Sequence, residues 1–152
     1  MIIIKAEIQH LKDLVPLFDA YRVFYRQTSN PEAAKQFLKQ RLEKQDTIIY
    51  IAYAEDKAVG FMHLFHSFTS VAMQPIYILN DLFVDKNHRK KGIGVALLNQ
   101  AKEKAKQDLC KFVALQTETD NPAQFLYESM GWKKDVDLQY TWENENLTFS
   151  KK

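Results

Sequence analysis

The stretch Arg89-Lys90-Lys91-Gly92-Ile93-Gly94 holds half of the four glycines in this 152-residue chain and places three cations beside them. It follows an apolar, strand-like run at Ile76–Val84 and opens the segment Gly92–Gln107, whose apolar residues recur at helical spacing. A helix start exposes unpaired backbone N–H groups and a partial positive charge, and glycine lets an anion approach them closely. The stretch therefore predicts a phosphate-binding turn between a strand and a helix.

Two other phosphate-binding motifs do not fit this turn. A Walker loop needs GxxxxGK[ST], which the run from Gly92 does not supply. A dinucleotide fingerprint needs a third glycine three residues on, where Leu97 stands. A glycine-assisted turn with a solvated basic rim is the alternative explanation of these residues.

Segments with strand and helix patterns flank the turn on both sides, in the order βααβββαβαβ. This order predicts one α/β-layered domain of the α+β class over residues 1–152. The expected strands are Ile2–Ala6, Thr47–Ala54, Ala58–Phe65, Ile76–Val84, Phe112–Thr117 and Leu138–Trp142. The expected helices begin near Leu11 and at Ser29-Asn30-Pro31, the second running to Glu43, and then cover Gly92–Gln107 and Ala123–Met130.

Proline and glycine set several element boundaries. If Asp13 is the N-cap of the first helix, Pro16 falls in its first turn, whereas a start at His10 implies a kink. The polar and apolar residues of His66–Gln74 predict a loop, and Gly131 predicts the end of the last helix.

Composition excludes several classes of protein. The chain is 46% apolar and 26% charged, with a formal net charge of +2, so we expect a globular protein that binds neither nucleic acid nor membrane by bulk charge. Cys110 is alone, which excludes an internal disulfide, and we expect no metal site. The apolar run at Met1–Ile4 is too short for a signal peptide, so we expect a cytoplasmic location.

The glycine turn matches the (Arg/Gln)-x-x-Gly-x-(Gly/Ala) signature of the GCN5-related N-acetyltransferases, and Leu79–Asp85 resembles the strand before it. About thirty residues on, Asp120–Trp132 (DNPAQFLYESMGW) resembles the second block of that family, Asn-x-x-Ala-x-x-x-Tyr-Glu-x-x-Gly-(Phe/Tyr). The resemblance covers nearly the whole chain. It implies a mixed, mostly antiparallel central sheet with helices on both faces, and acetyl-coenzyme A as the co-substrate.

The resemblance also assigns the coenzyme contacts. The backbone of Leu82 and Val84 would pair with the pantetheine arm where two strands splay apart, and the N–H groups from Lys90 to Val95 would hold the diphosphate. The family asparagine falls on Asp120, with Asn121 one place later, so either residue could meet the arm. The full set is Leu82, Phe83, Val84, Arg89, Lys90, Lys91, Gly92, Ile93, Gly94, Val95, Asp120, Asn121, Gln124 and Tyr127.

The implied reaction moves an acetyl group directly to a primary amine in a ternary complex. Tyr127 is the candidate general acid for the departing thiolate, and its alternative is a core tyrosine on an amphipathic helix. Asp81 is the candidate base, and its alternatives are an ion pair with a lysine or a capping role. On a regular strand Asp81 points to the side of Leu79 and Phe83. Candidates for lining the acceptor site are Tyr25, Asn80, Asp81 and Glu118.

Other side chains are weaker candidates. Cys110 has no His near it in the sequence, and the family transfers directly, so we expect no covalent intermediate. His63 and His66 face opposite sides of a strand and are not expected to share a metal.

Two other functions remain open at this stage: a coenzyme A-binding module without catalysis, and a nucleic-acid module that uses Lys86–Lys91. The resemblance is closest to small-amine, polyamine or histone-type acetyltransferases, and a polyamine, an amino acid, an antibiotic and a protein lysine all remain possible acceptors. The aromatic residues of Leu138–Phe149 suggest a homodimer paired through this segment.

Overall fold

The computed structural model describes residues 1–147, and the chain divides into two compact units. One unit consists of residues 1–116, and the other begins at Thr117. The expectation of a single domain over residues 1–152 therefore stays a prediction. No helix among residues 1–147 is long and apolar enough to cross a membrane.

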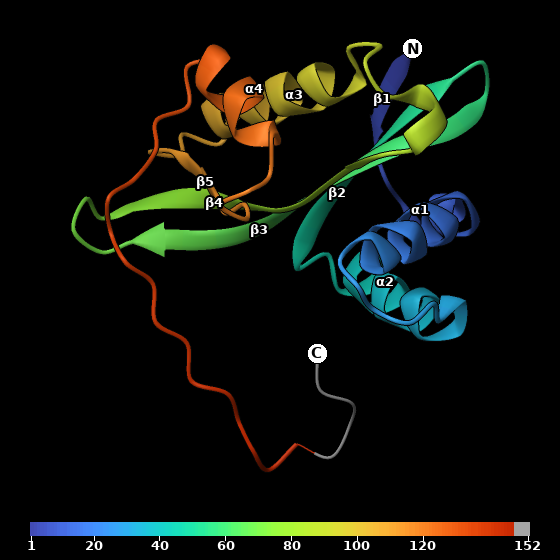
Figure 1. Cartoon of the computed structure of the whole chain (residues 1–152), viewed down its shortest axis with the longest axis horizontal. Helices are drawn as coiled ribbons and strands as arrows, with labels where there is room; N and C mark the ends of the chain where they lie inside the picture. Colours follow the sequence, from blue (N-terminus) through green and yellow to red (C-terminus); the bar gives the residue numbers. More distant parts are fainter. Residues whose placement is uncertain (148–152) are drawn as a thin grey trace. The chain divides into compact units, whose positions relative to one another are not determined.

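The first unit contains a five-stranded sheet with the strand order β1-β2-β3-β4-β5. Strands β1 to β4 are antiparallel to their neighbours, and β5 runs parallel to β4, which confirms the expected mixed sheet. Helices α1 and α2 cover one face, and α3 covers the other (Figure 1). The strands are β1 (Ile2–Lys5), β2 (Thr47–Ala54), β3 (Lys57–Thr69), β4 (Gln74–Val84) and β5 (Val113–Leu115). The helices are α1 (Leu11–Phe24), α2 (Pro31–Lys44) and α3 (Ile93–Gln107), with α4 (Ala123–Ser129) in the second unit and short 3-10 turns η1 (Ile8–His10) and η2 (Lys86–His88).

Alternation along the strands divides the apolar residues between the two faces. Ile51 pairs with Phe61, and Phe61 pairs with Phe83, so these side chains share one face. They belong to a buried cluster with Leu14 of α1 and Leu38 of α2. The opposite face is covered by the buried residues of α3, which are Ile93, Leu97, Leu98, Ala101 and Ala105.

A β-bulge in β4 interrupts this alternation. His63 pairs with Asp81 and the next residue of β3, Leu64, pairs with Leu79, so Asn80 is an extra residue. Because consecutive residues of β3 point to opposite faces, their partners Asp81 and Leu79 do so as well. The expectation that Asp81 points to the same side as Leu79 is therefore wrong. The expectation that it points to the same side as Phe83 is confirmed.

The first helix begins earlier than the Asp13 cap predicts. Its N-cap is His10, and Pro16 lies inside the helix. Asp13 is not available as a cap because its carboxylate accepts a hydrogen bond of 2.8 Å from the hydroxyl of Tyr53. Burial, helped by this bond, raises the pKa of Tyr53 to about 12. At α2 the prediction is confirmed, since Asn30 caps the helix and Pro31 opens it.

Two other predicted segments are wrong. The predicted loop His66–Gln74 is mostly strand, because β3 runs to Thr69 and pairs with a β4 that begins at Gln74. Leu138–Trp142 has no strand structure, and Leu138, Tyr140 and Trp142 are exposed. Phe149 lies outside the described residues, as do Lys151 and Lys152. The homodimer through this segment stays a prediction.

Gly60 lets β3 approach β4 closely. A Cβ built at Gly60 would lie 2.9 Å from the backbone oxygen of Phe83 and 3.3 Å from a methyl group of Ile93. We expect Gly60→Ala to lower the free energy of unfolding by about 1–3 kcal/mol, because the backbone of β4 at Phe83 would have to shift to make room for the methyl group. Urea denaturation measures this. The control is Gly94→Ala, whose Cβ meets nothing within 4 Å and should change stability by less than about 1 kcal/mol. Equal stability losses in the two variants would contradict the close approach.

Candidate active site

Within the first unit, the second half of β4 has no strand partner on its outer edge. Strand β5 pairs with β4 only where Tyr77–Leu79 lies beside Val113–Leu115. Beyond Leu79, β4 continues to Val84, and within the first unit no strand pairs with its outer edge there. The bulge at Asn80 lies at the point where the pairing stops. This is the splay that the family resemblance implies.

The backbone of Leu82 and Val84 faces this open edge. The N–H of Asp85 points toward β3 and donates a hydrogen bond of 2.8 Å to the carbonyl of Val59. Backbone groups alternate sides along a strand, so those of Leu82 and Val84 point away from β3. The Val84 carbonyl accepts a hydrogen bond of 3.0 Å from Nε of Arg89, which lies on that outer side. The two predicted backbone positions are therefore directed outward.

The glycine turn leads from this edge into α3. Lys90 and Gly92 have left-handed backbone conformations, with φ of 62° and 82°, and Gly92 is the N-cap. The N–H of Ala96 bonds to the Gly92 carbonyl, so the N–H groups of Ile93, Gly94 and Val95 precede the helical hydrogen bonds. A Cβ built at Gly92 or Gly94 would meet no atom within 4 Å. The helix start is thus accessible to an anion.

The side chain of Arg89, one of the predicted coenzyme contacts, packs against two aromatic rings. Its guanidinium carbon lies 5.5 Å from the centroid of the Phe24 ring and 5.7 Å from that of Phe83. With its bond to Val84, the side chain ties α1, β4 and the turn together. Its backbone remains part of the turn, where Lys90 and Lys91 have exposed side chains.

Asp81 is buried and bound to a histidine. The residue is 4% exposed, and its Oδ2 lies 2.9 Å from Nδ1 of His63, which is 1% exposed. Its Oδ1 accepts a hydrogen bond of 2.9 Å from Nδ2 of Asn80. The expected alternative of an ion pair with a lysine is wrong, because the partner is His63.

A third strand extends this contact. Nε2 of His63 lies 2.6 Å from Oγ1 of Thr47 at the start of β2. Sequence reasoning missed both His63 and Thr47 as site residues. Only the register of the β3–β4 hairpin could have placed His63 opposite Asp81, since the two are 18 positions apart.

Aromatic side chains of α1 reach the same part of β4. The hydroxyl of Tyr21 donates to the Asn80 carbonyl at 3.3 Å. Its ring centroid lies 5.0 Å from that of Tyr25 and 6.2 Å from that of Phe83. The structure therefore brings Tyr25 and Asn80 together through Tyr21, which was not among the predicted site residues.

The predicted residues Asp120, Asn121, Gln124, Tyr127 and Glu118 belong to the second unit. Asn121 accepts a hydrogen bond of 2.9 Å from the N–H of Ala123 and so holds the start of α4. Gln124 donates to the carbonyl of Thr119 at 2.9 Å. The ring centroid of Tyr127, on α4, lies 6.3 Å from that of Trp132.

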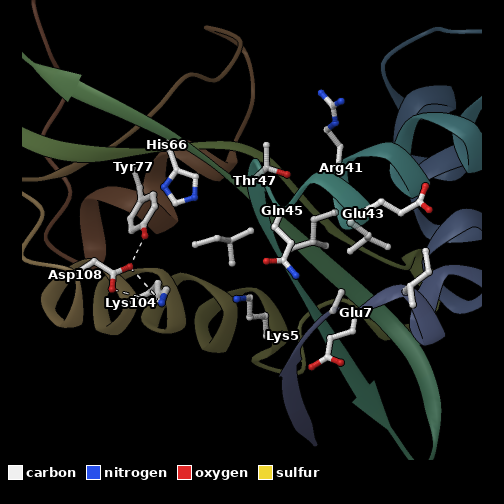
Figure 2. A pocket seen from close by; sticks show the side chains of 15 residues that line it. Lys5, Glu7, Arg41, Glu43, Gln45, Thr47, His66, Tyr77, Lys104 and Asp108 are labelled. Carbon is white, nitrogen blue, oxygen red and sulfur yellow. Dashed lines mark hydrogen bonds and ion pairs between the residues drawn. The ribbon is translucent and has the colours of Figure 1, made fainter.

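A pocket of about 560 Å³ lies at the other end of α3 from the glycine turn, between the ends of β1 and α2 and the start of β2. Figure 2 shows Thr47, His66, Tyr77, Lys104 and Asp108 among its walls. The hydroxyl of Tyr77 donates to Asp108, which lowers the pKa of that carboxyl, and Lys104 lies 3.2 Å from it. This pocket contains none of the predicted coenzyme contacts.

The burial of the His63–Asp81 pair predicts a large cost of removing one partner. We expect His63→Leu to lower the free energy of unfolding by about 3 kcal/mol, because Asp81 would keep a buried charge with only Asn80 as donor. The chain offers a matched control in His88, whose Nδ1 also lies 2.9 Å from an aspartate, Asp85, but whose side chain is 22% exposed. His88→Leu should lower the free energy of unfolding by less than about 1 kcal/mol. Urea denaturation measures both variants, and similar losses would contradict the larger cost at the buried pair.

A sequence profile of the acetyltransferase (GNAT) family matches residues 14–132. An uncharacterized N-acetyltransferase, YhfO, from Bacillus subtilis is 47% identical over 124 residues, covering 81% of this chain and 83% of its own length. A probable acetyltransferase from Haemophilus influenzae is 36% identical over 104 residues, covering 68% of this chain and 71% of its own.

Solved structures agree in fold. The crystal structure of a probable acetyltransferase matches with a TM-score of 0.91 at 36% identity, covering 97% of this chain and all of the other. The aminoglycoside 6'-N-acetyltransferase from Acinetobacter haemolyticus matches with a TM-score of 0.78 at 23% identity, over 96% of this chain and all of the other, a similarity of fold alone. The chain belongs to the GNAT family of acetyltransferases.

Proposed function

We propose that this acetyltransferase moves an acetyl group from acetyl-coenzyme A to a primary amine, directly and within a ternary complex. The observation that carries the proposal is the edge of β4 without a strand partner in the first unit, which is followed, after η2 and the glycine turn, by the amides at the start of α3. Bound acetyl-coenzyme A would supply the acetyl thioester, and its sulfur would leave as a thiolate when the amine nitrogen attacks.

The residues present fit such a ligand. The N–H groups of Ile93, Gly94 and Val95 would hold its diphosphate, since these positions combine free donors with a positive helix end and no obstructing side chain. The outward backbone of Leu82 and Val84 would pair with the amides of the pantetheine arm, as an added strand does.

Asp81 is the proposed acceptor of the amine proton. An alkylammonium like that of lysine has a pKa of ~10.4, so the amine must lose a proton before it can attack. The carboxylate of Asp81 receives one donor on each oxygen, from Asn80 and His63, and each oxygen keeps a lone pair. Asp81 follows the bulge at Asn80 and the last residue of β4 that pairs with β5, which supports this role.

The acceptor amine would meet aromatic rings before it reaches Asp81. Tyr21 and Tyr25 lie in contact next to Asn80, and ring faces attract an ammonium group. This supports a cationic primary amine as the acceptor class, with Glu118 as a further proposed contact.

Direct transfer is favoured over an acyl-cysteine intermediate. Cys110 is the sole cysteine of the chain, and burial raises the pKa of its thiol. A thiol held in its neutral form is a poor nucleophile. Tyr127 would instead protonate the departing thiolate, since a phenol remains a proton donor at neutral pH.

The proposed diphosphate site predicts a charge effect at Gly92. We expect Gly92→Glu to weaken the binding of coenzyme A by more than about a hundredfold, because it adds a negative charge where an anion binds. Gly92→Gln is the control: it has the same bulk and the same backbone strain at φ 82° but no charge, and should weaken binding less. Calorimetric titration measures both, and equal affinities for the two variants would contradict an anion site here.

The proposed acid predicts that Tyr127→Phe lowers kcat about a hundredfold while the affinity for coenzyme A changes less than twofold. The assay is thiol release with acetyl-coenzyme A and a panel of primary amines. Tyr140→Phe removes the same hydroxyl at a position 87% exposed and should leave kcat unchanged. An unchanged kcat in Tyr127→Phe would remove the acid role.

A further inference from the structure

We propose that Thr47 and His63 are positioning residues for Asp81, which they hold ionised and fixed in orientation for the proposed acetyl transfer. This inference rests on the proposed function, in which Asp81 receives the amine proton. The three side chains form one hydrogen-bonded row across β2, β3 and β4: Oγ1 of Thr47 lies 2.6 Å from Nε2 of His63, and Nδ1 lies 2.9 Å from Oδ2 of Asp81.

The sheet places the row on the face covered by α1 and α2. Thr47 pairs with Phe65, two residues from His63, so both side chains point to the same face. His63 pairs with Asp81, which shares this face with Phe83, the partner of Phe61. The bulge in β4 puts the amide of Asn80 within 2.9 Å of Oδ1. The extra residue of β4 therefore supplies the second donor to the carboxylate.

The row fixes which ring nitrogen of His63 carries a proton. An ionised carboxylate only accepts hydrogen bonds, so Nδ1 must carry the proton that points to Asp81. The hydroxyl of Thr47 can then donate to Nε2 of the neutral ring or accept from Nε2 of the charged ring. In either state both ring nitrogens are satisfied, although the ring is 1% exposed and has little access to water.

The row also offsets the cost of burying Asp81. A carboxylate that is 4% exposed loses most of its hydration, and hydrogen bonds from the protein must replace it. His63 and Asn80 supply one each, and Thr47 keeps His63 in the form that donates.

Two substitutions of His63 separate positioning from packing. His63→Asn places an amide nitrogen near the position of Nδ1 and keeps a donor to Asp81, but it leaves a cavity. His63→Gln fills the space better and reaches Thr47 rather than Asp81. We expect kcat to be about tenfold higher in His63→Asn than in His63→Gln, while the melting temperature has the opposite order. A purely structural role predicts the same order for both quantities, and that result would overturn the proposal.

Thr47 provides a second pair of variants. Thr47→Val removes the hydroxyl at nearly constant shape and should lower kcat roughly tenfold, with the KM for acetyl-coenzyme A unchanged, whereas Thr47→Ser should restore most of the loss. In an Asp81→Asn background, Thr47→Val should have no further effect on kcat, because the group that it positions is already gone. An additive loss in the double variant would overturn the proposal.

One measurement needs no substrate. Nitrogen-15 NMR of the histidine rings reports which nitrogen of His63 is protonated, and we expect a protonated Nδ1 in the wild type and in Thr47→Ser. A ring protonated only at Nε2 would overturn the proposal, since Asp81 would then have to be neutral. If the wild type turns over none of the amines, the proposed function fails, and the ring protonation alone then decides this inference.

Discussion

The early end of β5 is the constraint on which the rest of the site depends. Strand β4 loses its parallel neighbour after Leu79 and still continues to Val84, so part of a central strand keeps outward backbone groups that no strand of the first unit pairs. Unpaired strand edges attract extended ligands, and here the edge leads through a tight turn into a helix start with free amides. The end of the β4–β5 pairing thus leaves a strand edge for an extended ligand with amide groups. The helix start that follows can bind the anionic end of the same ligand.

Polar groups occur inside the sheet next to the point where the β4–β5 pairing ends. The bulge at Asn80 turns Leu79 to one face, and Asp81 shares the opposite face with Phe61 and Phe83. A carboxylate there is tolerated only with donors on its oxygens, and His63 and Asn80 supply them. On the outer side, Arg89 binds the carbonyl of Val84 and packs against two aromatic rings, which keeps the turn close to the strand end. The residues around β4 that stabilise the sheet and the turn are therefore also the ones next to the proposed site.

The sequence predicts much of this where local chemistry decides the structure. Asn30 and Pro31 mark a helix start, and the glycines after Lys91 mark a turn that needs a positive φ. The bulge was not predictable, because it depends on the register between β3 and β4 rather than on any residue type. The position of His63 opposite Asp81 depends on the same register. The segment His66–Gln74 has no clear apolar face in the sequence, so its pairing across the β3–β4 hairpin was not predictable either. Leu138–Trp142 has the alternation of a strand but no strand structure, since alternation alone provides no partner.

The proposed coenzyme site runs along the edge of β4 and ends at the start of α3. Amide NMR of the protein titrated with coenzyme A, and separately with pantetheine, tests it most directly. We expect coenzyme A to shift the signals of Leu82, Val84, Gly94 and Val95, whereas pantetheine, which has no diphosphate, should shift only those of the strand. Shifts centred on the pocket around Thr47 and Lys104, with Gly94 unaffected, would contradict it.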